Sequence, residues 1–140
     1  WSGPRALKGR AKWQGVARAA AKQARRAFVP EVGEPLDTRG LLGWVGRLVE
    51  AGGAALVCHE EAGAGIGSVL DGLRADSPGG RLPGRVAVVV GPEGGISPGE
   101  SEALACAGAA LVGVGPTVLR SSAAGAVALA LVLAAAGQYR

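Results

Sequence analysis

Two glycine-centred loops, each following a short apolar run, constrain this chain more than any other feature. The first is Gly91–Gly95, with the sequence Gly-Pro-Glu-Gly-Gly, and the second is Val114–Ser121, with the sequence Val-Gly-Pro-Thr-Val-Leu-Arg-Ser. A strand that ends in a glycine-rich turn presents bare backbone N–H and C=O groups at the carboxyl edge of a sheet, where ligands bind in open α/β folds. The two loops therefore predict a single pocket built from both.

Strand-like and helix-like patterns alternate along the chain. The stretch 85–90 contains five consecutive apolar residues, mostly β-branched, so we expect a strand covered on both faces. Ser97 and Glu100, with a proline between them, predict a capping box that starts a helix. The order of elements predicts an α/β fold, a mostly parallel sheet with helices on both faces. The expected strands are 54–59, 85–90 and 110–114, and the expected helices are 12–27, 38–51, 66–74, 98–107 and 122–136.

Composition favours a folded domain of the cytoplasm. The 140 residues suffice for one domain, and 49% are hydrophobic against 19% charged. The uncharged run over 121–138 is short for a membrane span and rich in alanine and glycine, so it predicts a buried helix and no membrane partner.

Cys58 and Cys106 are too few for a disulfide framework and have no metal-ligand spacing, so we expect buried thiols in a reducing cytosol and no metal site.

The amino-terminal segment is strongly basic. Eight lysines and arginines and no acidic residue precede Val29. Arg18, Lys22, Arg25 and Arg26 share much of one face of the helix expected over 12–27, which favours a polyanionic partner. A solvated helix surface with no partner is the alternative.

Each glycine loop carries one charged residue suited to chemistry. Glu93 places a carboxylate in the turn before the capped helix, and Arg120 places a guanidinium where the last helix begins. The two residues could act on a ligand in the shared pocket, or they could form an ion pair that joins the loops. No Ser/His/Asp set and no Walker sequence accompany them.

Four blocks of sequence together resemble one bacterial enzyme family. They are Gly91–Ser97, Val114–Gly125, the stretch 20–32 with Gln-Ala-Arg-Arg and Val-Pro-Glu-Val, and Leu56–Glu61. Taken together and in their order along the chain, the blocks closely resemble the methyltransferases that modify N3 of a uridine in 16S ribosomal RNA. These enzymes belong to the SPOUT superfamily. The resemblance covers essentially all of residues 12–136.

The resemblance implies a fold, a cofactor and partners. It implies a SPOUT-type domain with a deep carboxyl-terminal trefoil knot, S-adenosyl-L-methionine as cofactor, 16S ribosomal RNA of the small subunit as substrate, and a homodimer formed by the first and last helices. Arg120 and Glu93 are then the expected catalytic residues, and Arg18, Lys22, Arg25 and Arg26 the expected RNA-binding residues. We expect the cofactor to contact residues at strand ends and in the loops that follow: Val57, His59, Gly91, Glu93, Gly94, Gly95, Val114, Gly115, Val118, Leu119 and Ser121.

Two departures from the family pattern leave alternatives open. Ala123 stands where members usually carry a second hydroxyl residue. The family's amino-terminal RNA-binding barrel has no counterpart, so residues 1–140 are expected to be the catalytic domain alone. The alternatives are a non-catalytic RNA-binding module that retains the pocket, and a SPOUT relative that acts on another RNA.

Overall fold

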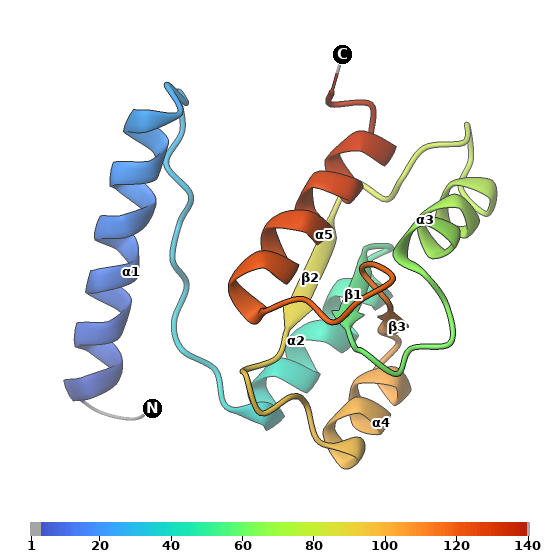
Figure 1. Ribbon diagram of the computed structural model, residues 1–140, viewed down its shortest axis with the longest axis horizontal. Helices are drawn as coiled ribbons and strands as arrows, with labels where there is room; N and C mark the ends of the chain where they lie inside the picture. Colours follow the sequence, from blue (N-terminus) through green and yellow to red (C-terminus); the bar gives the residue numbers. More distant parts are fainter. Residues whose placement is uncertain (1–3, 140) are drawn as a thin grey trace. The chain divides into compact units, whose positions relative to one another are not determined.

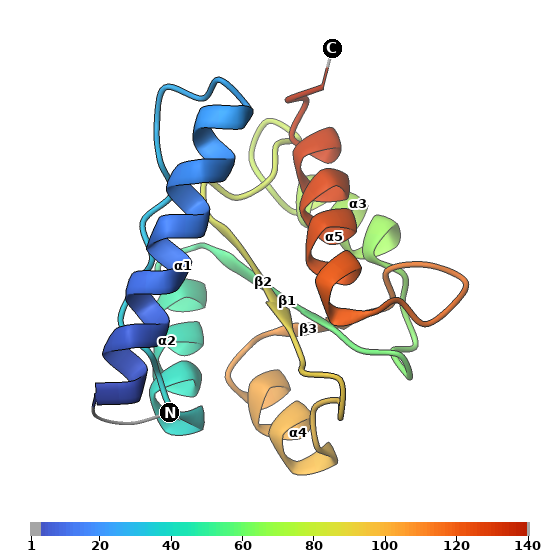
Figure 2. The same ribbon diagram turned by 60° about the vertical axis from the view of Figure 1, so that its left-hand side comes forward.

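The protein is described by a computed structural model that covers residues 4–139, and it divides after Asp37 into two compact units. The first contains one helix and an extended segment. The second contains the sheet and the remaining helices, shown from two directions in Figures 1 and 2.

In the first unit, helix α1 (Pro4–Gln23) is held against the extended chain that follows it. Gln14 is bonded at both ends of its amide, since Nε2 donates to the carbonyl of Pro30 at 3.1 Å and Oε1 accepts from the N–H of Val32 at 2.9 Å. Arg10 donates from Nε to the carbonyl of Val32 at 2.8 Å and pairs with Glu34. Two polar side chains of the helix therefore fix the course of the returning segment.

The predicted bounds of this first helix are wrong at both ends. The helix begins at Pro4 rather than at Lys12, and it ends at Gln23 rather than at Ala27. Arg25 adopts a left-handed backbone with φ of 51°, which turns the chain out of the helix. Arg25 and Arg26 therefore lie beyond the helix, and only Arg18 and Lys22 of the predicted basic stripe lie on it. The run of small and basic residues gave no sequence signal for this end, because alanine and arginine both favour continuing a helix.

The second unit is built on a three-stranded parallel sheet, as the order of elements predicted. Strand β1 (Ala54–Cys58) lies between β2 (Val86–Val90) and β3 (Ala110–Val112). Leu56 is paired with Val88 on one side and with Ala110 on the other. All three strands therefore end at the same edge.

Helices cover both faces of this sheet (Figure 2). Helices α2 (Thr38–Glu50) and α4 (Pro98–Cys106) pack on one face, where Val45 and Leu104 meet Val57. Helices α3 (Ile66–Ala75) and α5 (Ser121–Ala135) pack on the other, where Leu70 and Ala128 meet Leu56. Successive residues of β1 point to opposite faces, so one short strand serves both cores.

The predicted strand over 85–90 exists and packs against cores on both faces, but it is less completely buried than β1. Every residue of β2 is partly exposed, whereas Ala54–Val57 of β1 are buried. A run of valines predicts a strand but not its place in the sheet, and β2 is an edge strand among the residues described. Within residues 4–139, no helix has the length and apolar character needed to cross a membrane.

Candidate functional site

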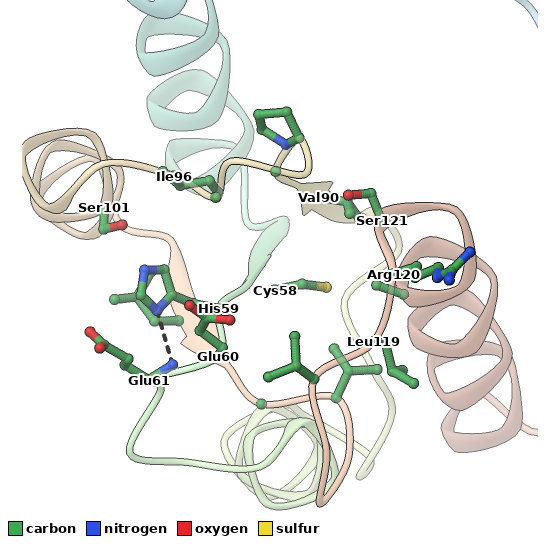
Figure 3. Close-up of a pocket in the computed structure, with 18 of the residues that line it drawn as sticks. Cys58, His59, Glu60, Glu61, Val90, Ile96, Ser101, Leu119, Arg120 and Ser121 are labelled. Carbon is green, nitrogen blue, oxygen red and sulfur yellow. Dashed lines mark hydrogen bonds between the residues drawn. The ribbon is translucent and has the colours of Figure 1, made fainter.

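The carboxyl edge of the sheet opens into a cavity of about 940 Å³ within the second unit. The ends of β1 and β2, both glycine loops and the first turns of α4 and α5 contribute to its walls (Figure 3). The position agrees with the rule that ligands bind outside the carboxyl ends of parallel strands. The volume is in the range of pockets for small organic ligands.

The first glycine loop is a tight turn with little room on one side. The N–H of Gly95 donates to the carbonyl of Pro92 at 2.8 Å, and Gly95 has a left-handed φ of 77°. A Cβ atom on Gly91 would lie 2.7 Å from Cγ1 of Ile96, so this position admits no larger residue without a shift. Gly94 differs from both, since a Cβ there would meet nothing within 4 Å and its φ is not left-handed. A side chain at Gly91 or Gly95 would therefore strain the turn, whereas a side chain at Gly94 would enter open space.

The capping box predicted after this loop is confirmed. Ser97 accepts from the N–H of Glu100 through its hydroxyl, and the Glu100 carboxylate accepts from the N–H of Ser97 at 3.2 Å. Hydrogen bonds from the Ser97 side chain, from its backbone and from the Thr38 hydroxyl hold the pKa of the Glu100 carboxyl below its ordinary value. The loop thus ends on a firmly capped helix.

The second glycine loop is anchored at its beginning by the loop before α3. Gly113 donates to the carbonyl of Ala64 at 2.8 Å, and its own carbonyl accepts from the N–H of Ile66 at the same distance. At the other end of the loop, Arg120 is the N-cap residue of α5, and its carbonyl accepts from the N–H groups of Ala123 and Ala124 at 2.8 Å. Arg120 therefore occupies the helix start that the sequence predicted.

His59 follows β1 and has a defined ring environment. Its backbone N–H donates to the carbonyl of Val112 at 3.0 Å, which extends the pairing between β1 and β3. Its ring atom Nδ1 accepts from the N–H of Glu61 at 3.2 Å. Because Nδ1 is the acceptor, the neutral ring carries its proton on Nε2.

The structure brings almost all of the predicted pocket residues together. The residues of the prediction that line the cavity come from three separate parts of the chain: His59, Gly91, Glu93, Gly94, Gly95, Val114, Gly115, Val118, Leu119, Arg120 and Ser121. Ligand binding by these residues remains a prediction.

Val57 does not belong to this set. Its side chain is fully buried in the core formed with α2 and α4, while the next residue, Cys58, lines the cavity. The alternation of side chains along a strand accounts for the difference, because neighbours on β1 face opposite sides. Sequence reasoning placed the pocket at the end of the strand correctly and chose the wrong face.

The cavity also contains residues that sequence reasoning missed. Those with a reactive or ionisable side chain, or with a buried hydroxyl, are Cys58, Glu60, Glu61, Ser101 and Glu102. Glu60 and Glu61 directly follow a predicted strand, so the rule used for His59 could have found them. Ser101 and Glu102 lie on α4 and gave no such signal.

Charge is unevenly distributed around the cavity. Among residues 4–139, four carboxylates line it, from Glu60, Glu61, Glu93 and Glu102, against the one guanidinium of Arg120. Arg120 lies on the α5 side, and Glu60 and Glu61 lie across the cavity from it (Figure 3). The N-terminus of α5 adds partial positive charge beside Arg120. One end therefore suits developing negative charge, and the other suits neutral or cationic groups.

The alternative of an ion pair between the loops is not realised. Within residues 4–139, no salt bridge or hydrogen bond joins Glu93 to Arg120. Both side chains are exposed, and Arg120 extends away from His59 (Figure 3). Both groups are thus available to a ligand.

The two cysteines have different environments. Cys58 is half-buried in the cavity wall, and burial raises the pKa of its thiol. Cys106 is exposed at the end of α4, so the expectation that both thiols are buried is wrong for this residue. The apolar sequence around Cys106 did not reveal that it lies on the outer side of a short helix.

The predicted RNA-binding residues all lie in the first unit and are exposed. Arg18 and Lys22 project from α1, and Arg25 and Arg26 follow its end. None of them has an ion-pair partner among the residues described. These four cations are therefore free to meet phosphate.

Residues 1–133 match the family known as the RNA methyltransferase domain. The chain is 47% identical over 132 residues to proteins of Mycobacterium bovis and Mycobacterium tuberculosis, both named ribosomal RNA small subunit methyltransferase E. These residues are 94% of this chain and 47% of each relative, so the chain spans about half the length of the curated relatives it matches.

A solved structure with the same arrangement is the ribosomal RNA small subunit methyltransferase E of Neisseria gonorrhoeae, bound to S-adenosyl methionine. It superposes with a TM-score of 0.67 at 25% identity, covering 96% of this chain and 48% of the other. The similarity thus extends over both units of the chain and stops at about half of the longer protein.

Proposed function

Because this chain belongs to the RNA methyltransferase domain family, we propose that it is the catalytic domain of an S-adenosylmethionine-dependent enzyme that methylates N3 of a uridine in 16S ribosomal RNA. The observation that carries the proposal is the single cavity between the two glycine loops. The names of the relatives support the small-subunit RNA as substrate, and the bound molecule in the gonococcal structure supports the cofactor.

The residues around the cavity fit such a cofactor. A volume of about 940 Å³ accommodates an adenosine with an amino-acid chain. Gly94 and Gly115 leave open space beside the backbone, which allows a ligand to approach peptide N–H and C=O groups. Val114 and Leu119 add apolar walls. When bound, S-adenosylmethionine would supply an electrophilic methyl group.

Arg120 and Glu93 are the candidate catalytic side chains. Uracil N3 must lose its proton, and the negative charge that develops spreads to the neighbouring carbonyl oxygens. Arg120 offers a guanidinium at the positive end of α5, where it stabilises this charge. Glu93 orients the base or accepts the N3 proton, and its exposed carboxylate is compatible with either role.

The basic residues of the first unit hold the RNA backbone. Arg18, Lys22, Arg25 and Arg26 supply charge-assisted contacts to phosphate, which give affinity without sequence information. The carboxylates around the cavity repel phosphate, so the base rather than the backbone enters the pocket.

A non-catalytic RNA-binding module is the weaker alternative. Its support in the sequence was Ala123, where the family usually has a hydroxyl residue. Ala123 is exposed and does not line the cavity, so its missing hydroxyl removes nothing from the pocket walls described here. The pocket therefore favours the enzyme.

We further propose the trefoil knot and the homodimer that the resemblance implied, and the cytoplasmic location that the two unpaired cysteines favoured. Supporting the knot, the chain after β3 is bonded on both sides of Gly113 to the loop before α3. Supporting the dimer, α5 leaves Val127, Leu129 and Leu131 exposed, and apolar surface of this kind favours association. Sedimentation at micromolar concentration tests the dimer, and a monomer there would contradict it.

The decisive experiment is methylation of small ribosomal subunits that lack the modification. We expect the purified protein to transfer one methyl group from S-adenosylmethionine to a uridine, and mass mapping to place it on N3 of 16S ribosomal RNA. Methylation of transfer RNA or of a ribose 2′-oxygen would show a relative of different specificity. Cofactor binding without any transfer would favour the non-catalytic module.

A further inference from the structure

Ser101 presents an unpaired hydroxyl in the wall of the cavity. The residue is only 6% exposed, and its Oγ has no hydrogen-bond partner within the part of the chain that the structure describes. Ser101 lies on α4 and lines the cavity, and its Oγ is buried just beneath the wall on the side of His59 (Figure 3). A buried hydroxyl without a partner is unfavourable, and such groups in folded proteins are usually paired once ligands and waters are present.

A second donor lies on the same side of the cavity. With Nδ1 of His59 occupied by the N–H of Glu61, Nε2 carries the proton and is free to donate. In Figure 3 the imidazole lies between Ser101 and Glu61. Ser101 and His59 thus present a hydroxyl and a ring N–H toward one end of the pocket.

The charges nearby restrict what these donors can receive. Glu60 and Glu61 lie in this part of the cavity, and Glu102 follows Ser101 on α4, whereas the one guanidinium that lines the cavity among the described residues, that of Arg120, lies across it. An anionic carboxylate placed here would be repelled by like charge. A neutral carbonyl oxygen accepts the same hydrogen bonds without that cost.

We propose that Ser101, together with His59 Nε2, positions the target base by donating hydrogen bonds to one of its carbonyl oxygens. The proposal rests on the function proposed above. Uracil has a carbonyl on each side of N3, so either oxygen can accept the hydrogen bonds that Ser101 and His59 donate. Two donors from separate elements fix the orientation of a flat ring more tightly than either can alone.

The test compares Ser101→Ala with Ser122→Ala, which removes an exposed hydroxyl outside the cavity. For Ser101→Ala we expect kcat/KM toward the RNA to fall about fivefold to tenfold, the size of one neutral hydrogen bond. Binding of S-adenosylmethionine, measured by calorimetry, is expected to remain unchanged. The thermal midpoint of the ligand-free protein should not fall, because the lost hydroxyl had no partner. Ser122→Ala should alter none of these values.

Ser101→Cys separates the hydrogen bond from the volume of the side chain. A thiol is somewhat larger than the hydroxyl, so it leaves no void, but it is a weak donor, and this variant should therefore resemble Ser101→Ala in kcat/KM. Full activity in both variants would overturn the inference. A second outcome would also overturn it: weaker binding of S-adenosylmethionine with unchanged binding of 5′-methylthioadenosine, which lacks the amino-acid chain. That result would mean that the hydroxyl binds the amino-acid end of the cofactor and not the base. An inactive parent protein that binds no cofactor would instead refute the proposed function itself, and this inference with it.

Discussion

The two units of this protein differ in charge and in what each can contribute to a reaction. Residues 1–37 carry eight basic and three acidic side chains, a formal net charge of +5, whereas residues 38–140 carry seven and eight, a net charge of −1. The first unit has a basic helix whose polar side chains bond mainly to its own returning segment. The second has a sheet edge, glycine loops and a cavity whose charged lining residues are mostly carboxylates.

The difference indicates that the two units interact with different parts of a polyanionic substrate. A cavity with four carboxylates is a poor site for phosphate, whereas an exposed basic helix is a good one. Affinity for the RNA backbone and chemistry on the base therefore reside in different units. Substitutions in one unit should leave the function of the other intact, and the predictions below use this separation.

The largest effect is expected for Gly94→Val, in the second unit. The branched side chain would occupy the open space beside Gly94 that a ligand needs, so cofactor binding and methyl transfer should both be lost. Folding should be preserved, because Gly94 is not left-handed and a Cβ there meets no other atom. Calorimetry, an activity assay and thermal unfolding measure these three outcomes. Gly84→Val is the control, since Gly84 has the same freedom but lies outside the cavity. Undiminished cofactor binding in Gly94→Val would remove this loop from the site.

Arg120→Ala should lower turnover and spare binding. Loss of a donor that acts mainly on charge in the transition state typically lowers kcat about 10²–10³-fold. Binding of S-adenosylmethionine should change little, since the ground state does not depend on this cation. Single-turnover methylation and calorimetry separate the two quantities. Arg81→Ala, in an exposed loop away from the cavity, is the matched control. Normal turnover in Arg120→Ala would mean that the protein stabilises the developing charge elsewhere.

Removing the basic residues of the first unit should weaken RNA binding alone. In a variant with glutamine at 18, 22, 25 and 26, the slope of log affinity against log salt should fall by about 3, because each phosphate contact contributes about 0.7–0.9. Cofactor affinity, which belongs to the second unit, should be unchanged. The control replaces the same number of cations outside the cavity in the second unit: Arg47, Arg74, Arg81 and Arg85. An equal loss of RNA affinity in both variants would contradict the proposal that the first unit binds the RNA backbone.

The smallest effect concerns the cap that supports the first glycine loop. Hydrogen bonds to Ser97 and Thr38 lower the pKa of Glu100, so the ionised carboxylate stabilises the folded state. This contribution is present above the ordinary pKa of 4.5 and is lost as the pH falls through the lowered native value. Glu100→Gln should therefore unfold slightly more easily than the parent near pH 7 and equally easily in strong acid. Thermal unfolding across this pH range measures it, and a difference that persists in acid would assign the effect to packing.

Much of the second unit could be predicted from local sequence. The capping box at Ser97, the helix start beside Arg120 and the stretch of β1 each depend on residues close together in the chain. Local propensity and hydrogen bonding determine such features, so a single sequence contains them. The carboxyl-edge rule then brought His59 and both glycine loops to one pocket without any knowledge of contacts.

Only the tertiary structure decided the features that depend on distant parts of the chain. The half-exposed edge position of β2 follows from strand order, and the burial of Val57 in place of Cys58 follows from which face of β1 each helix pair covers. The Ser101 hydroxyl is buried without a partner because α4 packs beside the loop that contains His59. The physical reason is common to all three. Periodicity and propensity describe a segment by itself, whereas burial and hydrogen-bond satisfaction are properties of pairs of segments that only folding brings together.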